Sequence, residues 1–160
     1  MVRILPLRGH HDRKSFDCGN ADLNRWLATM ARQHMDKGIS STFVATDTET
    51  SPAVYGFYSV SIGELRSAEF SASRAKKYPQ RIPVFRIGRL AVSNQQQGLG
   101  LGRILLANAI ERLTDTAAIV GGMGILVDSK PSALPFYQRY GFEPLADDHP
   151  LELFLPLSRS

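Results

Sequence analysis

The chain has 160 residues, 43% of them hydrophobic, and a formal net charge of +4 at pH 7, which is the composition of a folded globular domain and argues against wholesale disorder. No apolar run approaches the roughly 20 residues of a membrane span, and the first residues lack the apolar stretch of a signal peptide. The single cysteine, Cys18, can form neither an internal disulfide nor a thiolate metal cluster by itself, so we expect a cytoplasmic protein.

The first predicted helix lies between Asn20, a residue type that favours the N-cap, and Gly38, which supplies a plausible end. Six of its residues recur at helical spacing, namely Leu23, Trp26, Leu27, Met30, Ala31 and His34. We expect Trp26 and Met30 in the core. Two strands are predicted next, at residues 41–47 and 52–65.

The second half of the chain alternates strands and helices. A short helix is predicted before Pro79, a strand at 84–92, and a long helix after the glycines at 98–102. A short buried strand at 122–128, a helix at 132–142 closed by Gly141, and a last strand at 150–157 complete the pattern. This order predicts an α/β fold, a mixed sheet with helices on both faces, in one domain spanning residues 1–160.

Three glycines alternate with leucines between the strand that ends near Val92 and the long helix, namely Gly98, Gly100 and Gly102. Glycine permits positive φ and close backbone approach, and free amides at the positive end of a helix dipole bind anions. The spacing therefore suggests a site for a phosphate or pyrophosphate.

Three motifs compete for this loop. The phosphate loop of nucleotide hydrolases is excluded, because Arg103 follows the last glycine where that motif needs a lysine and a hydroxyl. The dinucleotide fingerprint fits poorly, because the third glycine comes one residue early and residues 116–125 contain no acid. The pattern Q-x-x-G-x-G, which begins at Gln97, fits.

With this loop and the later segment ALPFYQRYGF at 133–142, the chain resembles the GNAT acetyltransferase superfamily. The resemblance implies a GNAT fold, an α+β arrangement whose mostly antiparallel sheet is splayed at the acetyl-CoA site, with acetyl-CoA as co-substrate and no metal. It implies Tyr137 as the catalytic general acid. It also implies these cofactor-binding residues: Leu90, Ala91, Val92, Gln97, Gly98, Leu99, Gly100, Leu101, Gly102 and Arg103.

Acetyl transfer to an amine is compatible with these residue types. An α-amino group has a pKa of about 7.7 to 8.0, so part of it is already neutral at pH 7 and no strong protein base is needed. A tyrosine hydroxyl can donate a proton to the departing thiolate, and juxtaposing two bound substrates supplies much of the rate.

Charge is concentrated between Arg66 and Arg89, where seven basic residues face a single acid, Glu69. The positive potential of such a segment steers an anionic partner toward one face of the protein.

The segments FDCGNADLNRWL, GFYSVS and PVFRIGRLAV are similar to the TacT-type GNAT toxins of bacterial toxin–antitoxin pairs. That resemblance implies acetylation of the α-amino group of aminoacyl-tRNA, which blocks translation, a neutralising ribbon-helix-helix antitoxin and a homodimer. The tRNA-binding residues would be Arg74, Lys76, Lys77, Arg81, Arg86 and Arg89.

Other interpretations remain open from the sequence. The acceptor could be a small amine or a protein N-terminus, or the chain could bind CoA or an antitoxin without catalysis. The glycines could form a plain turn, Tyr137 could be a packing residue, and the basic segment an ordinary solvated surface. We expect Cys18 to be buried and inert, and His10 and His11 to lie on the surface.

Overall fold

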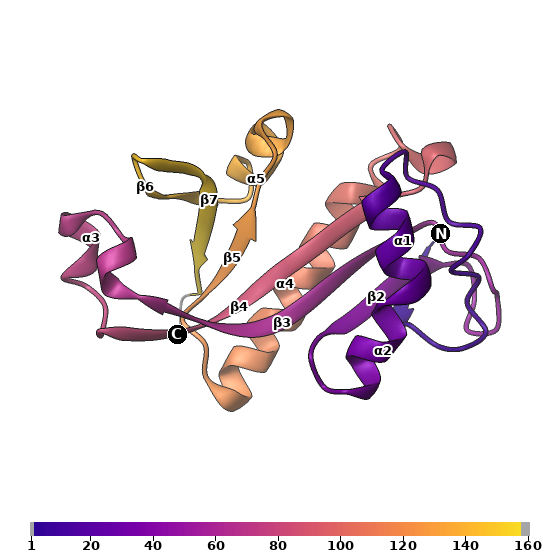
Figure 1. Cartoon of the computed structure of the whole chain (residues 1–160), viewed down its shortest axis with the longest axis horizontal. Helices are drawn as coiled ribbons and strands as arrows, with labels where there is room; N and C mark the ends of the chain where they lie inside the picture. Colours follow the sequence, from indigo (N-terminus) through magenta and orange to yellow (C-terminus); the bar gives the residue numbers. More distant parts are fainter. Residues whose placement is uncertain (1, 158–160) are drawn as a thin grey trace. The chain divides into compact units, whose positions relative to one another are not determined.

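The computed structural model describes residues 2–157, within which seven strands form one sheet in the order β1-β2-β3-β4-β5-β7-β6 (Figure 1). β1, β2 and β3 pair antiparallel, β4 pairs parallel with β5, and β5, β7 and β6 pair antiparallel, so the predicted mixed, mostly antiparallel α/β fold is confirmed. The elements in chain order are β1 (Arg3–Pro6), α1 (Ala21–Thr29), α2 (Ala31–Asp36), β2 (Ser41–Thr46), β3 (Gly56–Arg66), α3 (Ala72–Ala75), β4 (Arg81–Val92), α4 (Leu101–Val120), β5 (Gly124–Asp128), α5 (Leu134–Gln138), β6 (Glu143–Ala146) and β7 (His149–Pro156).

The described residues form two compact units. The first unit comprises residues 2–61 and 88–111, and therefore holds β1, β2, α1, α2, the start of β3, the end of β4 and the first half of α4. The second unit comprises residues 62–87 and 112–157 and holds α3, α5, β5, β6, β7 and the remaining parts of β3, β4 and α4.

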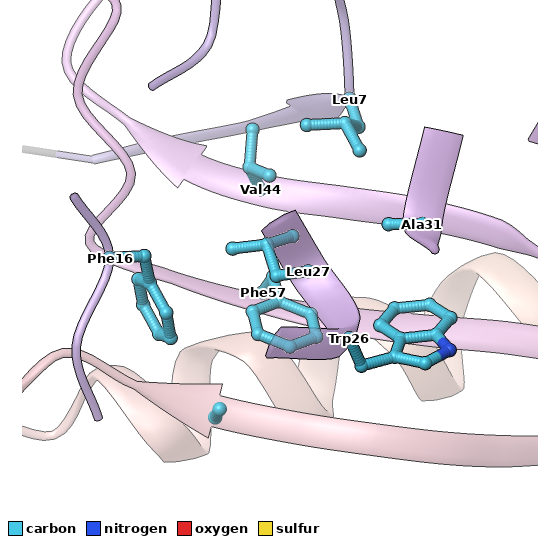
Figure 2. Packing of buried hydrophobic residues seen from close by; sticks show 8 residues of the cluster. Leu7, Phe16, Trp26, Leu27, Ala31, Val44 and Phe57 are labelled. Carbon is cyan, nitrogen blue, oxygen red and sulfur yellow. The ribbon is translucent and has the colours of Figure 1, made fainter. Parts of the chain in front are cut away.

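In the first unit, helices cover both faces of the sheet, as predicted. Phe57 of β3 lies in the apolar cluster beneath α1, where its ring stacks 6.0 Å from that of Trp26 (Figure 2). The next residue, Tyr58, points to the opposite face, and its hydroxyl donates a 2.6 Å hydrogen bond to Asn108 Oδ1 on α4. Successive strand residues face opposite sides of a sheet, so β3 is packed between α1 and α4.

The helix predicted between Asn20 and Gly38 is broken into α1 and α2. Asn20 caps α1 as expected, since its Oδ1 accepts hydrogen bonds from the backbone amides of Asp22 and Leu23, and Gly38 follows α2 with a φ of 73°. Met30 lies at the break with a φ of −114°, and 38% of its surface is exposed. Its predicted place in the core is wrong, because α1 ends at Thr29 and α2 starts at Ala31, so Met30 lies between the two helices.

The N-terminal segment is more ordered than we expected. The strand β1 was not predicted, and His11, expected on the surface, is only 3% exposed. Its Nδ1 accepts a 2.9 Å hydrogen bond from the backbone amide of Arg8, and burial lowers its pKa, so the neutral form is favoured.

The second unit has its own apolar cluster, which includes Phe70, Leu126, Leu145 and Phe154. Gly124 of β5 faces the ring of Phe154 so closely that a side chain there has no room. The strand β6 was missed in the sequence, because only four residues form it and their burial does not alternate cleanly.

Two features are absent from the described residues. No helix among them is long and apolar enough to cross a membrane. Within residues 2–157, no group of three or more His, Cys, Asp or Glu side chains is placed to hold a metal ion.

Candidate active site

The glycine loop joins β4 to α4 as predicted. β4 ends at Val92, and α4 begins at Leu101 and runs for 20 residues. Gly98 and Gly100 have φ values of 81° and 84°, which side-chain-bearing residues adopt only with strain. The third glycine differs, because Gly102 lies in the first turn of α4 and is not among the glycines with positive φ. The loop therefore needs glycine for its conformation at two positions.

The side chain of Gln97 fastens this loop to its own unit. Its Nε2 donates hydrogen bonds to the carbonyl oxygen of Val92, at 3.0 Å, and to that of Cys18, at 3.2 Å. Beside it, the backbone amide of Asn94 donates a 2.8 Å bond to the carbonyl of Asp17. The hydrogens of the Gln97 side-chain amide are thus used within the protein, and its place among the cofactor-binding residues stays a prediction.

The segment that braces the loop, residues 17–19, was not recognised from the sequence as part of the site. The spacing of 79 residues between Cys18 and Gln97 leaves no local signal for the contact. Cys18 itself is half-buried rather than buried, and its thiol lies 3.8 Å from the carbonyl oxygen of Asn20.

The end of β4 leads into the loop. Ala91 is buried in the core cluster of the first unit, and Leu90 and Val92 are half-buried. In the described residues, the parallel register of β4 with β5 consists of Phe85 opposite Ile125 and Arg86 opposite Leu126, and β4 continues beyond it to Val92. Alternate peptide groups of a strand point to opposite edges, so an extended chain could pair with residues 90–92.

Tyr137 lies on α5, within the second unit. Its ring packs edge-on against Phe136, at 5.2 Å, and Phe142, at 5.7 Å. Burial raises the pKa of its hydroxyl, which stays protonated and able to donate at neutral pH. Within residues 2–157 this hydroxyl has no hydrogen-bond partner, so it is available to a ligand. Gly141 follows α5 with a φ of 92°, as predicted.

The structure divides the six predicted tRNA-binding residues into two classes. Three make contacts inside the protein: Arg74 donates to the carbonyl of Pro144 at 2.9 Å, Arg86 pairs with Asp128 at 2.9 Å, and Arg89 lies over the ring of Trp26. The other three, in the part of the chain that the structure describes, are exposed and without ion pairs: Lys76, Lys77 and Arg81.

Residues 18–150 match the family model of the acetyltransferase (GNAT) domain. The chain belongs to this family. Among curated GNAT relatives, it is 34% identical over 145 residues to a tRNA-acetylating toxin of Mycobacterium tuberculosis, covering 90% of this chain and 85% of the toxin. It is 27% identical to a probable toxin TacT of Sinorhizobium fredii, covering 97% and 91% of the two chains.

Solved structures of GNAT toxins have the same fold. A KacT mutant with one tyrosine replaced by phenylalanine superposes with a TM-score of 0.90 at 28% identity, covering 98% of this chain and 95% of that one. AtaT complexed with acetyl-methionyl-tRNAfMet superposes with a TM-score of 0.87 at 31% identity and the same coverage. An AtaT tyrosine-to-phenylalanine mutant bound to acetyl-CoA and the C-terminus of the antitoxin AtaR gives 0.80 at 28% identity, covering 98% and 94%.

Proposed function

We propose that this GNAT protein transfers the acetyl group of acetyl-CoA to the α-amino group of an aminoacyl-tRNA in the cytoplasm. Blocking that amino group prevents peptide-bond formation, so the protein acts as a toxin that inhibits translation. The observation that carries the proposal is the glycine loop at the start of α4 in a chain 34% identical to a tRNA-acetylating toxin. The matched residues 18–150 fall in both compact units, which supports one catalytic domain.

Acetyl-CoA binding is assigned to the first unit. The backbone amides of residues 98–103, next to the positive end of the α4 dipole, would donate hydrogen bonds to the pyrophosphate oxygens. The peptide groups of Leu90, Ala91 and Val92 would pair with the pantetheine amides, so that the ligand continues the sheet. Gln97 contributes by holding the loop in shape rather than by donating to the ligand.

The transfer step needs one proton donor. The neutral α-amino nitrogen attacks the thioester carbonyl, the new C–N bond forms as the C–S bond breaks, and the amine releases a proton to water. Tyr137 would give its proton to the departing thiolate and recover one from solvent. Its raised pKa supports this role, because the hydroxyl remains protonated until it is needed.

The partners follow from the same proposal. Lys76, Lys77 and Arg81 would bind the phosphate backbone of tRNA without sequence preference. A ribbon-helix-helix antitoxin would neutralise the enzyme, and the structure of AtaT with the antitoxin AtaR supports a partner of this kind. We also propose a homodimer, whose two basic surfaces would act together.

The decisive experiment is incubation of the protein with labelled acetyl-CoA and total charged tRNA, followed by nuclease digestion and identification of the labelled aminoacyl-adenosines. We expect label on the α-amino group of at least one aminoacyl-adenosine, and about 10²-fold less initial incorporation with Tyr137→Phe. Label that appears instead on polyamines or on protein N-termini would replace the tRNA proposal with the alternative acceptors.

A further inference from the structure

Arg89 differs from the other basic residues of the segment 66–89. It is the only one of the six predicted tRNA-binding residues that belongs to the first unit, which also carries the glycine loop. Its guanidinium carbon lies 4.1 Å from the centre of the Trp26 ring. In residues 2–157 it has no carboxylate partner and no hydrogen-bond acceptor, and burial lowers its pKa. Arg89 is therefore a partly desolvated cation whose N–H groups have no acceptor among the described residues.

The ring beneath Arg89 is firmly held. Trp26 is only 7% exposed, stacks on Phe57 at an interplanar angle of 16°, and meets the ring of His34 edge-on at 5.7 Å. Figure 2 shows Trp26 and Phe57 side by side in the core cluster. A guanidinium that stacks one face on a fixed indole keeps its N–H edges in a defined orientation, which favours an anion with two adjacent acceptor oxygens, such as the non-bridging oxygens of a phosphodiester.

The position of Arg89 along β4 indicates which anion it meets. Ala91 shares the core cluster with Trp26, and residues two apart on a strand face the same side, so Arg89 lies on the α1 side of the strand. It directly precedes Leu90, where the proposed pantetheine segment begins, and a strand advances about 3.3 Å per residue. The pyrophosphate of the carrier would lie at the opposite end of that segment, beyond Val92, so the anion at Arg89 must belong to the acceptor.

We propose that Arg89, supported by Trp26, binds the phosphodiester of the 3′-terminal nucleotides of the aminoacyl-tRNA and so positions its α-amino group at the thioester. This inference rests on the proposed function. Lys76, Lys77 and Arg81 contact the body of the tRNA, whereas Arg89 contacts its end. Substitutions of Lys76, Lys77 or Arg81 should therefore matter only for a full-length tRNA, whereas a substitution of Arg89 should also matter for a short acceptor.

The test compares a full-length aminoacyl-tRNA with an aminoacylated CCA trinucleotide as acceptors. Arg89→Gln should lower kcat/KM about 10- to 100-fold on both acceptors. Both carry the 3′-terminal phosphodiester, and the substitution removes a charge-assisted, bidentate contact with it. Arg89→Lys should recover only part of the activity, because an ammonium supplies the charge without the planar fork. The matched control Lys76→Gln should lower kcat/KM on full-length tRNA and leave the trinucleotide rate unchanged.

The single tryptophan of the chain gives an independent readout of the site. Titration of the wild-type protein with a non-hydrolysable, amide-linked aminoacyl-CCA should change Trp26 fluorescence saturably, and Arg89→Gln should raise the apparent Kd at least tenfold. An unchanged KM for acetyl-CoA and an unchanged melting temperature would show that Arg89→Gln leaves the fold and the carrier site intact.

Four results would overturn the inference. A loss of activity in Arg89→Gln confined to full-length tRNA would place Arg89 on the tRNA body. Wild-type activity in Arg89→Gln, or no Trp26 response while the wild-type protein acetylates tRNA, would remove Arg89 from the acceptor site and leave the proposed function standing. Failure of the wild-type protein to acetylate any aminoacyl-tRNA would instead end both proposals.

Discussion

The glycine loop and the basic segment contribute to the proposed site in different ways. In the loop, residues 97–103, the predicted anion site consists of backbone amides, and two glycines adopt the positive φ that the motif requires. In the basic segment, residues 66–89, Arg74 and Arg86 use their polar groups inside the protein, and Arg89 stacks on Trp26. Backbone conformation is a local property, whereas a long charged side chain takes whichever partner the fold brings within reach.

The largest expected effect is on kcat and comes from Tyr137, against which the effects of the glycine loop and the basic segment can be compared. Tyr137→Phe should lower kcat about 10²-fold or more, because no proton donor remains for the thiolate, and should leave the KM for acetyl-CoA nearly unchanged. Because burial raises the pKa of Tyr137, its hydroxyl stays protonated through mildly alkaline pH, and its titration should cause no loss of wild-type activity there. Steady-state rates from about pH 6 to 9, where the aminoacyl ester survives the assay, measure both. Tyr140→Phe is the control, and equal rates in the wild type and Tyr137→Phe would end this assignment.

The next effect tests whether the loop acts through its backbone. Gly98→Ala and Gly100→Ala should each raise the KM for acetyl-CoA about tenfold, because a Cβ at positive φ costs roughly 1 to 2 kcal/mol. Gly102→Ala is the matched control and should leave that KM unchanged while stabilising α4 by up to about 1 kcal/mol. Equal KM values in all three variants would contradict the division of the glycines into two kinds.

A comparable effect is expected for the exposed cations of the basic segment. Changing Lys76, Lys77 and Arg81 together to Gln should weaken tRNA binding about tenfold at moderate salt and flatten the plot of log K against log salt, by up to about 0.9 per lost phosphate contact. Filter binding at several salt concentrations measures the slope. An unaltered slope would move the tRNA surface elsewhere.

Arg74 is the control for that experiment, because its substitution should change the stability of the protein and not the salt dependence of tRNA binding. Arg74→Gln should leave the salt slope unchanged and lower the free energy of unfolding by about 1 to 2 kcal/mol, because it removes the hydrogen bond to Pro144 and the stacking over Phe70. Chemical denaturation measures the loss. A flattened salt slope with full stability would return Arg74 to the tRNA-binding set.

The smallest effect tests how the loop is held. Gln97→Met keeps the length of the side chain but removes both hydrogen bonds, and should raise the KM for acetyl-CoA about fivefold. The KM for S-acetyl-pantetheine, which lacks the pyrophosphate, should not change. Gln95→Met and Gln96→Met are the neighbouring controls. If the substitution raised the KM for acetyl-CoA and the KM for S-acetyl-pantetheine equally, Gln97 would act on the pantetheine segment instead.

Much of the fold could be predicted from local patterns. Asn20 at the start of α1, Gly38 after α2, Gly141 after α5 and the buried strand β5 are all where the sequence indicated them, because caps, turns and short apolar runs depend on neighbouring residues. The strands β1 and β6 were missed, since four-residue strands are stabilised by the partner strand and carry little pattern of their own. The break at Met30 was missed for a related reason, because helical spacing continues through it.

The sequence by itself determined the composition of the glycine loop, the position of Tyr137 on a short helix and membership of an acetyltransferase family, because each depends on a few residues close together in the chain. Only the tertiary structure decided that Gln97 donates to the carbonyls of Val92 and Cys18, and that Arg74 donates to the carbonyl of Pro144 in β6. It also decided that Arg89 stacks on Trp26. Those contacts join residues as far as 79 positions apart, and their geometry exists only once the strands have paired and the cores have packed.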